Sequence, residues 1–291
     1  MLILISDAFG SSLQVELSKF GKVTDDKRKI AEAEIVLIRS KTKVTKEYID
    51  SAPNLKLIIR GGVGLDNVDL EYASEKGIAV YNTPAASAIA VAECAFTLMI
   101  GITNHIGRAD SSMRDGKWIK KELKRTELYR KTLGIIGLGR IGTELAKRGT
   151  AFGMTVVAYD PFVENSKYAE MKEEMKDVLN ISDYVSLHLP LIESTKGVIN
   201  SETLKEFKDG SFLINTGRGK TIVEEDVVDA LMSGKLAGFG NDVWYSDPPE
   251  KNLFADLPNV LLMPHLGAST KENLLRIGEI VEDIISEYVS S

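Results

Sequence analysis

Apolar positions along the chain fall into two kinds of run that alternate from one end to the other. Short unbroken runs of Ile, Leu and Val are separated by amphipathic segments such as "SLQVELSKF" and "GTELAKRGTAF". Unbroken runs are typical of strands buried on both faces, and the segments between them indicate helices, so the pattern predicts βαβ units and parallel sheets. The predicted strands are 2–6, 34–39, 55–60, 78–81, 133–137, 155–159, 184–188, 211–215, 236–240 and 260–263.

A long apolar helix predicted at about 87–105 and a basic stretch at 117–131 divide these strands into two sets. The length of 291 residues also favours two domains over a single core. We therefore expect an α/β protein with two doubly wound parallel-sheet domains, joined by helices and separated by a cleft. The final helix, within 269–289, follows the last strand and could pack on either domain.

Composition narrows the class of protein. Hydrophobic content of 44% and charged content of 27% are those of an ordinary soluble protein, and a net charge of −6 argues against nucleic acid or an anionic membrane as partner. The opening "MLILIS" lacks the basic region of a signal peptide, and the apolar stretch 86–103 contains Glu93, so we interpret them as a strand and a buried helix. The one cysteine, Cys94, excludes an internal disulfide framework and suits a reducing cytoplasm. We expect no metal site.

One predicted strand, 133–137, runs directly into the glycine-rich motif "GLGRIG" and then into a helix. Gly137 allows a tight turn, Gly139 leaves room for a pyrophosphate, and Gly142 lets the helix approach the strand. The phosphates would meet amide groups at the helix N-terminus, including those of Arg140 and Ile141. In this context the motif predicts a dinucleotide site, against the alternative of a plain glycine turn.

The strand after the glycine motif ends at Asp160, which lies 160 − 142 = 18 residues beyond the last glycine. A carboxylate at that distance is placed to bind the ribose hydroxyls of the adenosine half of a dinucleotide. The same carboxylate would repel a 2′-phosphate, so the predicted cofactor is NAD rather than NADP.

Polar side chains follow three later strands, at the ends where ligands bind in open parallel sheets. Arg218 follows 211–215, Asp242 and Asp247 follow 236–240, and His265 follows 260–263. Hydride transfer from a 2-hydroxy acid needs a base for the hydroxyl proton, a carboxylate that orients it and a cation for the substrate carboxylate. Singly, the arginine could be an ion-pair residue, Asp247 a turn former and the histidine a packed ring. Together they favour a catalytic site.

Longer motifs extend over nearly the whole chain. They are "RSKTKVT", "RGGVGLDNVDLEYASEKGIAVYNTP", "VAE" at 91–93, "DGKW", "KTLGIIGLGRIG", "YDP", "HLPLIESTKGVIN", "INTGRG", "DVW" with "DPP", and "PHLGASTKE". With these motifs the chain closely resembles the D-2-hydroxyacid dehydrogenases, and among them the D-3-phosphoglycerate dehydrogenases. The resemblance implies a Rossmann-type NAD domain beside a flavodoxin-like substrate domain.

The resemblance also implies roles for the polar residues. Arg218 would anchor the substrate and His265 would be the acid/base. The family has a glutamate five residues after the aspartate of "DV", and here that position is Asp247, which is one methylene shorter. Lys220 stands where a small residue is more usual, and it could add to anion binding or be a solvated surface lysine.

The remaining site residues follow from the same resemblance. Gly62 and Val63 would offer backbone amides to the substrate carboxylate, although "GGVG" could also be a plain tight turn. Asp242 would meet the nicotinamide amide. The residues that would line the cofactor are Thr216, His188, Leu189 and Pro190.

Substrate choice depends on Arg39 and Arg60, which each follow an apolar strand and match phosphate contacts of phosphoglycerate dehydrogenases. Paired guanidiniums suit a phosphomonoester, although each could instead form a structural ion pair. The predicted reaction is oxidation of 3-phosphoglycerate to 3-phosphohydroxypyruvate, the entry to serine synthesis. The alternatives are a glyoxylate/hydroxypyruvate or glycerate enzyme, which would not need both arginines, and more remotely an NAD-binding corepressor of the same fold.

The resemblance further implies that both ends of the chain fold together. Residues 1–95 and 268–291 would form the substrate domain, and 96–267 the NAD domain. It implies a homodimer through the NAD domains, with 100–130 as the candidate interface. Longer family members carry a C-terminal regulatory domain, and because this chain ends after its last helix we expect no serine feedback within this polypeptide.

Overall fold

The computed structural model describes residues 1–290, which fold into two units. Unit 1 comprises Met1–Ala88 and the C-terminal segment from Ala268, and unit 2 comprises Ile89–Gly267. The first crossing between the units thus lies after Ala88 rather than at residue 95. The reason is that helix α4 (Ala88–Thr103) buries one side, including Ala92 and Met99, in the core of unit 2.

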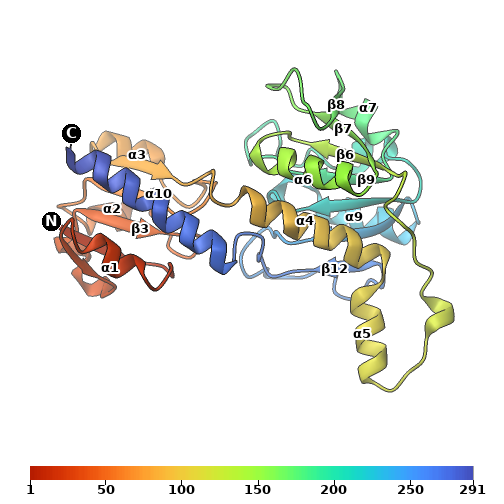
Figure 1. Cartoon of the computed structure of the whole chain (residues 1–291), viewed down its shortest axis with the longest axis horizontal. Helices are drawn as coiled ribbons and strands as arrows, with labels where there is room; N and C mark the ends of the chain where they lie inside the picture. Colours follow the sequence, from red (N-terminus) through yellow and green to blue (C-terminus); the bar gives the residue numbers. More distant parts are fainter. Residues whose placement is uncertain (291) are drawn as a thin grey trace. The chain divides into compact units, whose positions relative to one another are not determined.

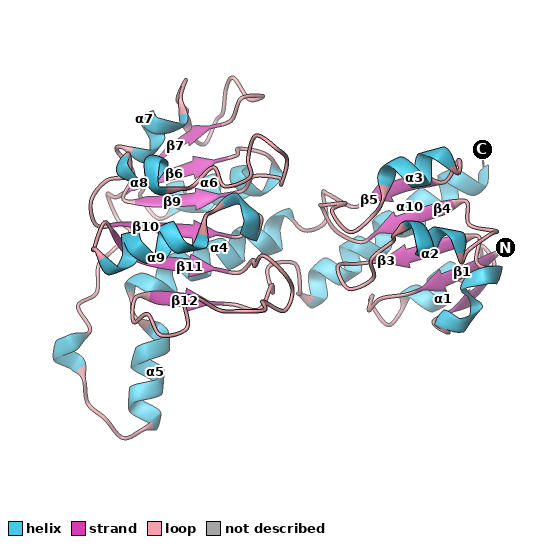
Figure 2. Ribbon diagram, turned by 180° about the vertical axis from the view of Figure 1, so that it is seen from behind, coloured by secondary structure: helices cyan, strands magenta, loops and turns pink. Residues whose placement is uncertain are grey.

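Unit 1 is built on a five-stranded parallel sheet with the order β2-β1-β3-β4-β5. This is the strand order of flavodoxin-like folds, as the family resemblance implied. Figure 2 shows the strands of each sheet side by side, with helices packed on them. The strands are β1 (Leu2–Ile5), β2 (Lys22–Thr24), β3 (Ile35–Ile38), β4 (Leu57–Arg60) and β5 (Ala79–Asn82).

Successive side chains of these strands point to opposite faces of the sheet, so they form two hydrophobic cores, one on each face. Leu4, Val36 and Ile58 pack with helices α2 and α3, and their odd-numbered neighbours Ile3 and Ile35 pack with α1 and α10. The final helix buries every fourth residue from Ile277 to Ile285 and so belongs to unit 1, where Figure 1 shows it beside α1. The helices are α1 (Leu13–Leu17), the 3-10 turn η1 (Lys27–Glu32), α2 (Lys46–Asp50), α3 (Leu70–Glu75) and α10 (Lys271–Ser290).

Unit 2 contains a seven-stranded parallel sheet with the order β12-β11-β10-β9-β6-β7-β8. The chain order reverses at β6, which pairs with β7 on one side and β9 on the other, as in a Rossmann fold. The doubly wound α/β architecture predicted from the sequence is therefore confirmed. The strands are β6 (Thr132–Ile136), β7 (Thr155–Tyr159), β8 (Glu170–Met171), β9 (Tyr184–Leu187), β10 (Ser211–Asn215), β11 (Leu236–Asn241) and β12 (Val260–Leu262).

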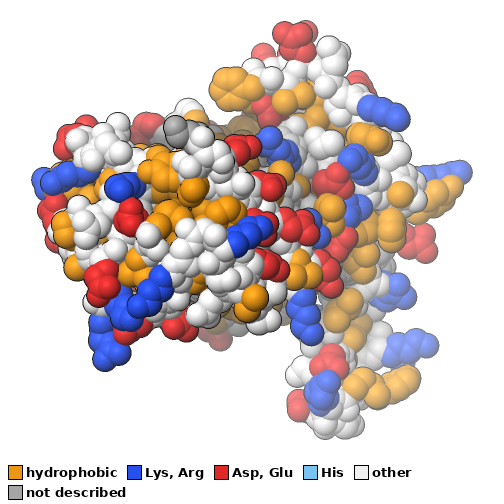
Figure 3. Space-filling model, turned by 60° about the vertical axis from the view of Figure 1, so that its left-hand side comes forward, with side chains coloured by type: hydrophobic (Ala, Val, Ile, Leu, Met, Phe, Trp, Pro, Cys, Tyr) orange, Lys and Arg blue, Asp and Glu red, His pale blue; other side chains and the backbone are white. Residues whose placement is uncertain are grey.

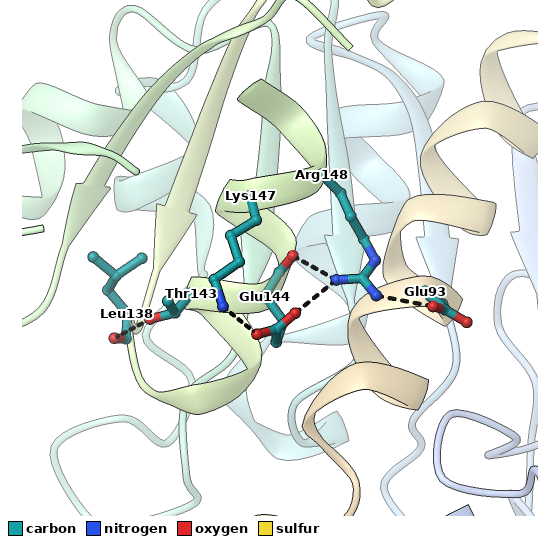
Figure 4. A network of polar contacts seen from close by, with 6 residues as sticks. All are labelled: Glu93, Leu138, Thr143, Glu144, Lys147 and Arg148. Atoms are coloured by element: carbon teal, nitrogen blue, oxygen red, sulfur yellow. Dashed lines mark hydrogen bonds and ion pairs between the residues drawn. The ribbon is translucent and has the colours of Figure 1, made fainter. Parts of the chain in front are cut away.

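Helices cover both faces of this sheet. α4 and α6 (Arg140–Ala151) share one core, and α7 (Met175–Leu179), α8 (Ser201–Lys205) and α9 (Glu224–Met232) share the other. α6 is also tied to α4 by an ion pair, because Arg148 Nη2 donates to Glu93 of α4 at 2.8 Å, while Nη1 of the same arginine donates to Glu144 within α6 at 2.9 Å (Figure 4). The helix that begins at the glycine motif is thereby fixed against α4.

Three details differ from the sequence pattern. Strands β2 and β8 are not predicted, because both are short edge strands with few buried side chains and no apolar run. The helix predicted at 87–105 ends at Thr103, where His105 adopts a left-handed conformation (φ 52°) and starts α5 (Ile106–Arg114). The basic stretch that follows holds only the 3-10 turn η2 (Lys120–Glu122).

Helix length and composition also bear on membrane crossing. Within residues 1–290 no single helix is long and apolar enough to span a membrane, whereas α4 and α5 taken together, with a 62° bend between them, pass that test.

Candidate active site

The glycine motif forms the turn between β6 and α6, and its three glycines differ in what a side chain there would meet. Gly137 has φ 93°, and a Cβ there would lie 2.8 Å from the carbonyl oxygen of His188. A Cβ on Gly142 would lie 2.3 Å from the carbonyl oxygen of Gly137. A Cβ on Gly139 would meet no atom within 4 Å, so at this position the backbone borders open space.

The start of α6 suits an anion. Gly139 is its N-cap residue and no side chain caps the helix, so the first amides, including those of Arg140 and Ile141, have no intrahelical acceptor. Amides at a helix N-terminus bind phosphate well. The open space at Gly139 and these uncapped amides therefore fit the pyrophosphate of a dinucleotide.

Asp160 follows β7 and is bonded to the glycine turn. Its Oδ2 accepts from the amide of Leu138 at 2.8 Å, and its Oδ1 accepts from the amide of Phe162 at 2.9 Å. The carboxylate thus holds the middle of the turn in place. Sequence reasoning predicted a ribose contact for this residue and did not anticipate the bond to Leu138.

The ends of β9 and β10 lie next to the glycine turn. His188 follows β9, and its ring contacts Ser186 Oγ at 3.0 Å and Thr216 Oγ1 at 3.4 Å. Burial lowers the pKa of the His188 imidazole to about 4, so this ring is neutral near pH 7. Leu189 is half-buried and Pro190 is exposed at the same edge. Of the predicted cofactor-lining residues, the structure brings His188 and Thr216 into contact.

Arg218 lies in a turn after β10 that the buried Asn215 organises. Asn215 Oδ1 accepts from the amide of Gly217, and its Nδ2 donates to the carbonyl oxygen of Arg218, both at 3.0 Å. The guanidinium folds back, since Nη1 donates to the carbonyl oxygen of Gly217 at 2.8 Å. Sequence reasoning missed this role for Asn215, whose one signal was its place at a strand end.

Asp242 is buried at the end of β11 and supports the turn that follows the candidate histidine. Its two oxygens accept from the amides of Leu266 at 2.7 Å and Gly267 at 2.8 Å. Burial raises the pKa of this carboxyl group, and the two amide bonds oppose the shift. His265 itself has φ 56°, a left-handed backbone conformation that residues other than glycine rarely adopt. The carboxylate therefore stabilises a strained turn.

His265 and Asp247 are paired. Nδ1 of the imidazole is hydrogen-bonded to Oδ2 of the carboxylate, and both side chains are partly open to solvent. This bond leaves Nε2 as the nitrogen that can face a substrate. The shorter aspartate side chain thus reaches the ring. Such a pair can remove a proton from a hydroxyl group and return it.

In unit 1 the predicted substrate residues lie at the carboxyl ends of β3 and β4. Ile38 pairs with Arg60 in the sheet, so Arg39 is one residue beyond that pair. A Cβ on Gly62 would lie 1.6 Å from Nη1 of Arg60, so this guanidinium packs against the glycine backbone. The carbonyl oxygen of Gly62 accepts from the amide of Thr83 at 3.0 Å, which fixes the loop that also contains Val63.

Arg39 is half-buried and lacks a carboxylate partner among residues 1–290. Its Nη1 donates to the carbonyl oxygen of Ala8, at 3.3 Å, and its Nε is buried without a hydrogen-bond partner in the described part of the chain. Burial lowers the pKa of this guanidinium, and the charge of Asp7 opposes the shift. A partly buried guanidinium with an unsatisfied donor nitrogen and no ion pair is costly, so this geometry suits an anionic ligand.

The described residues offer nothing for a metal ion. Residues 1–290 contain no group of three or more His, Cys, Asp or Glu side chains placed to hold one. Lys220 is exposed in the turn η3 (Gly219–Thr221).

The chain is similar to known proteins over most of its length. Residues 96–267 match the family model described as the NAD-binding domain of D-isomer-specific 2-hydroxyacid dehydrogenases. A hydroxypyruvate reductase of Thermotoga maritima is 47% identical over 89% of this chain and 86% of its own length. A D-3-phosphoglycerate dehydrogenase of Methanocaldococcus jannaschii is 41% identical over 90% of this chain but 51% of its own length.

The fold is shared with solved structures. A D-lactate dehydrogenase from Aquifex aeolicus, complexed with NAD and lactic acid, superposes with a TM-score of 0.86 at 30% identity, covering 100% of this chain and 96% of its own. The chain spans about half the length of the phosphoglycerate dehydrogenases that it matches.

Proposed function

Because the chain belongs to the D-isomer-specific 2-hydroxyacid dehydrogenases, which are NAD-dependent oxidoreductases, we propose that it oxidises 3-phospho-D-glycerate to 3-phosphohydroxypyruvate, the first step of serine biosynthesis. The observation that carries this choice is the half-buried guanidinium of Arg39, which has no ion-pair partner among the described residues and lies one residue beyond the Ile38–Arg60 pair. A phosphomonoester supplies the charge and the acceptor oxygens that such a group needs. Several relatives named D-3-phosphoglycerate dehydrogenase, at 36–41% identity, support the same substrate.

The cofactor site in this proposal is the edge of the sheet of unit 2. The amides of Arg140 and Ile141 and the open backbone at Gly139 would hold the pyrophosphate, and Asp160 would bind the adenosine ribose. Asp242 would meet the nicotinamide amide, and the residues that would line the cofactor are His188, Leu189, Pro190 and Thr216. When bound there, NAD would supply the acceptor for the hydride from C2 of the substrate.

His265 is the proposed acid/base. As the hydride leaves, Nε2 takes the proton of the C2 hydroxyl group, and the resulting imidazolium is stabilised by the carboxylate of Asp247 on Nδ1. Arg218 would bind the substrate carboxylate and polarise the developing carbonyl group. In the reverse direction the same histidine returns the proton.

Unit 1 contributes the groups that select the substrate. The amides of Gly62 and Val63 would bind the substrate carboxylate, and the bond from the amide of Thr83 to the carbonyl oxygen of Gly62 would hold their loop in place. Arg39 and Arg60 would bind the phosphate. Their position at neighbouring strand ends suits one anion of about −2 charge.

A second candidate is reduction of hydroxypyruvate. It is favoured by the relative at 47% identity, which is named hydroxypyruvate reductase. The same histidine and arginine would serve, with an unphosphorylated substrate. Arg39 would then have no ligand, and this is why we prefer the phosphorylated acid.

We also propose a cytoplasmic homodimer. α5 and the segment after it expose apolar side chains, among them Trp118, which is 77% exposed, and Tyr129 at 58%. Figure 3 shows apolar side chains beside basic ones over this lowest part of the picture. A second copy covering this surface would bury them. The single free cysteine, Cys94, suits a reducing cytoplasm.

The test is a spectrophotometric panel of 3-phosphoglycerate, D-glycerate, glyoxylate, hydroxypyruvate and D-lactate with both nicotinamide coenzymes. Arg60→Ala should raise KM for 3-phosphoglycerate far more than KM for any unphosphorylated acid. Arg28→Ala, which alters an exposed arginine of the same unit, is the matched control and should change neither. Equal effects of Arg60→Ala on both kinds of acid would remove the phosphate argument.

A further inference from the structure

Asp7 forms three hydrogen bonds with the turn that begins at Arg39. It follows β1, which pairs with β3 in the sheet. Its Oδ2 accepts from the amides of Arg39 at 2.7 Å and Thr42 at 3.0 Å, and its Oδ1 accepts from the hydroxyl group of Thr42 at 2.7 Å. Burial acts to raise the pKa of Asp7, but the bonds from Thr42 and Arg39 outweigh it and leave the pKa lowered. The carboxylate is therefore ionised and fully engaged with the turn.

Asn67 holds the same turn from its other side. Its Nδ2 donates to the carbonyl oxygen of Arg39 at 2.7 Å and to that of Thr42 at 2.6 Å. Both the amides and the carbonyl groups at the two ends of the turn are thus bonded to side chains. A turn fixed in this way holds the Cα–Cβ direction of Arg39 constant.

The carboxylate of Asp7 bonds to the 39–42 turn rather than to the guanidinium of Arg39. A carboxylate so close to an arginine would ordinarily form an ion pair, yet the described residues include no ion pair of Arg39. The oxygens of Asp7 face backbone amides and a hydroxyl group instead. The guanidinium therefore feels the charge of Asp7 but is not bonded to it, and its donors remain able to bind a ligand.

We infer that Asp7 and Asn67 are positioning residues that set substrate specificity, by holding the 39–42 turn so that the Arg39 guanidinium meets the phosphate of the substrate. This inference rests on the proposed function, since it takes Arg39 as a phosphate ligand. Preorganised groups bind more tightly because no ordering cost remains at the moment of binding. Loss of the bonds of Asp7 should therefore weaken binding of a phosphorylated acid and spare an unphosphorylated one.

The experiment measures the dissociation constants of 3-phosphoglycerate and D-glycerate by calorimetry for five variants. Arg39→Ala tests the ligand. Asp7→Ala removes all three acceptor bonds and should raise the constant for 3-phosphoglycerate on the order of tenfold, with D-glycerate within about twofold. Thr42→Val removes one bond and should act in the same direction but less strongly, which keeps the test available if Asp7→Ala does not fold.

Two further variants separate position from charge and from stability. Asp7→Asn can keep the bonds, because the amide oxygen can accept from both backbone amides while its nitrogen donates to the Thr42 hydroxyl oxygen. It should therefore retain most of the affinity for 3-phosphoglycerate. Asp26→Asn alters a different carboxylate of unit 1 that also accepts from a backbone amide, that of Arg28, and it should leave both constants unchanged.

The outcomes distinguish the two claims. If Arg39→Ala weakens 3-phosphoglycerate selectively but Asp7→Ala weakens both acids equally or neither, the inference is wrong and the proposed function stands. If Arg39→Ala changes both acids equally, the phosphate assignment and the inference fall together. Selective loss in Asp7→Ala with recovery in Asp7→Asn supports the inference.

Discussion

Replacement of Asp160 by alanine tests how the coenzyme is selected. The carboxylate accepts from the amide of Leu138 in the glycine turn at 2.8 Å and from that of Phe162 at 2.9 Å. A hydrogen bond to a charged group is worth about 1.5–3 kcal/mol, and only the bond to Leu138 acts on the turn that would meet the pyrophosphate. The loss of that bond alone corresponds to a roughly 10- to 150-fold weaker affinity for NAD, and any lost ribose contact adds to it.

The same reasoning predicts that Asp160→Ala gains little use of NADP. Removing the negative charge removes the repulsion of a 2′-phosphate, but the turn that binds the pyrophosphate is loosened for both coenzymes. Asp160→Ser should show more activity with NADP than Asp160→Ala, because a hydroxyl group can still accept a hydrogen bond from the amide of Leu138. Glu164→Ala, a change of an exposed acidic residue in the same loop, is the control.

The dissociation constant of NADH is measured by fluorescence. The kcat/KM values for NAD and NADP are measured with 3-phosphoglycerate, or with the acid of the panel that is turned over fastest. Asp160→Ala should lose NADH affinity with NADP activity still below the wild-type level with NAD. Affinity for NADH within twofold of the wild type would refute a supporting role for this carboxylate. A preference of Asp160→Ala for NADP would show that charge repulsion alone determines which coenzyme is used.

Three more changes test the catalytic edge of unit 2. His265→Asn should lower kcat by about 10²–10⁴-fold with NADH affinity retained, and unchanged turnover would remove His265 from the mechanism. Asp242→Asn sets an amide donor against the amide of Leu266 or Gly267, so urea unfolding should show a loss of about 3 kcal/mol, and an unchanged midpoint would contradict this. Because burial lowers the pKa of His188 from 6.5 to about 4, the unfolded chain binds the extra proton between these values, and stability should fall as pH drops from 6.5 to 4 by about 3 kcal/mol at most. His188→Gln should flatten the urea-midpoint profile over that range, and a profile parallel to the wild type would refute the assignment.

Much of the fold can be predicted because buried parallel strands leave unbroken apolar runs. The run at 35–38 becomes β3, the middle strand of the sheet of unit 1, and the run at 133–136 becomes β6, an interior strand of the sheet of unit 2. Edge strands such as β8 escape prediction, since a strand with one neighbour and exposed side chains needs no apolar run.

The site was less predictable than the fold. A glycine motif reveals its own backbone demands, so the roles of Gly137 and Gly142 follow from the sequence alone. The bond from Asp160 to Leu138 and the bonds from Asp242 to the turn after His265 depend on which amides a turn leaves unpaired. Backbone conformation at single residues sets that pairing, and a pattern of apolar and polar positions carries no record of it.

Substitution by alanine has different consequences at the three glycines of the turn, Gly137, Gly139 and Gly142. Alanine at 137 or 142 collides with backbone atoms, so selection for folding alone removes it. Alanine at 139 collides with nothing in the polypeptide and would pass a screen for expression or heat resistance. A homologue that no longer bound the dinucleotide would therefore be expected to lose Gly139 before Gly137 or Gly142. Replacement of Gly139 alone would then identify a homologue that still folds but no longer catalyses the reaction.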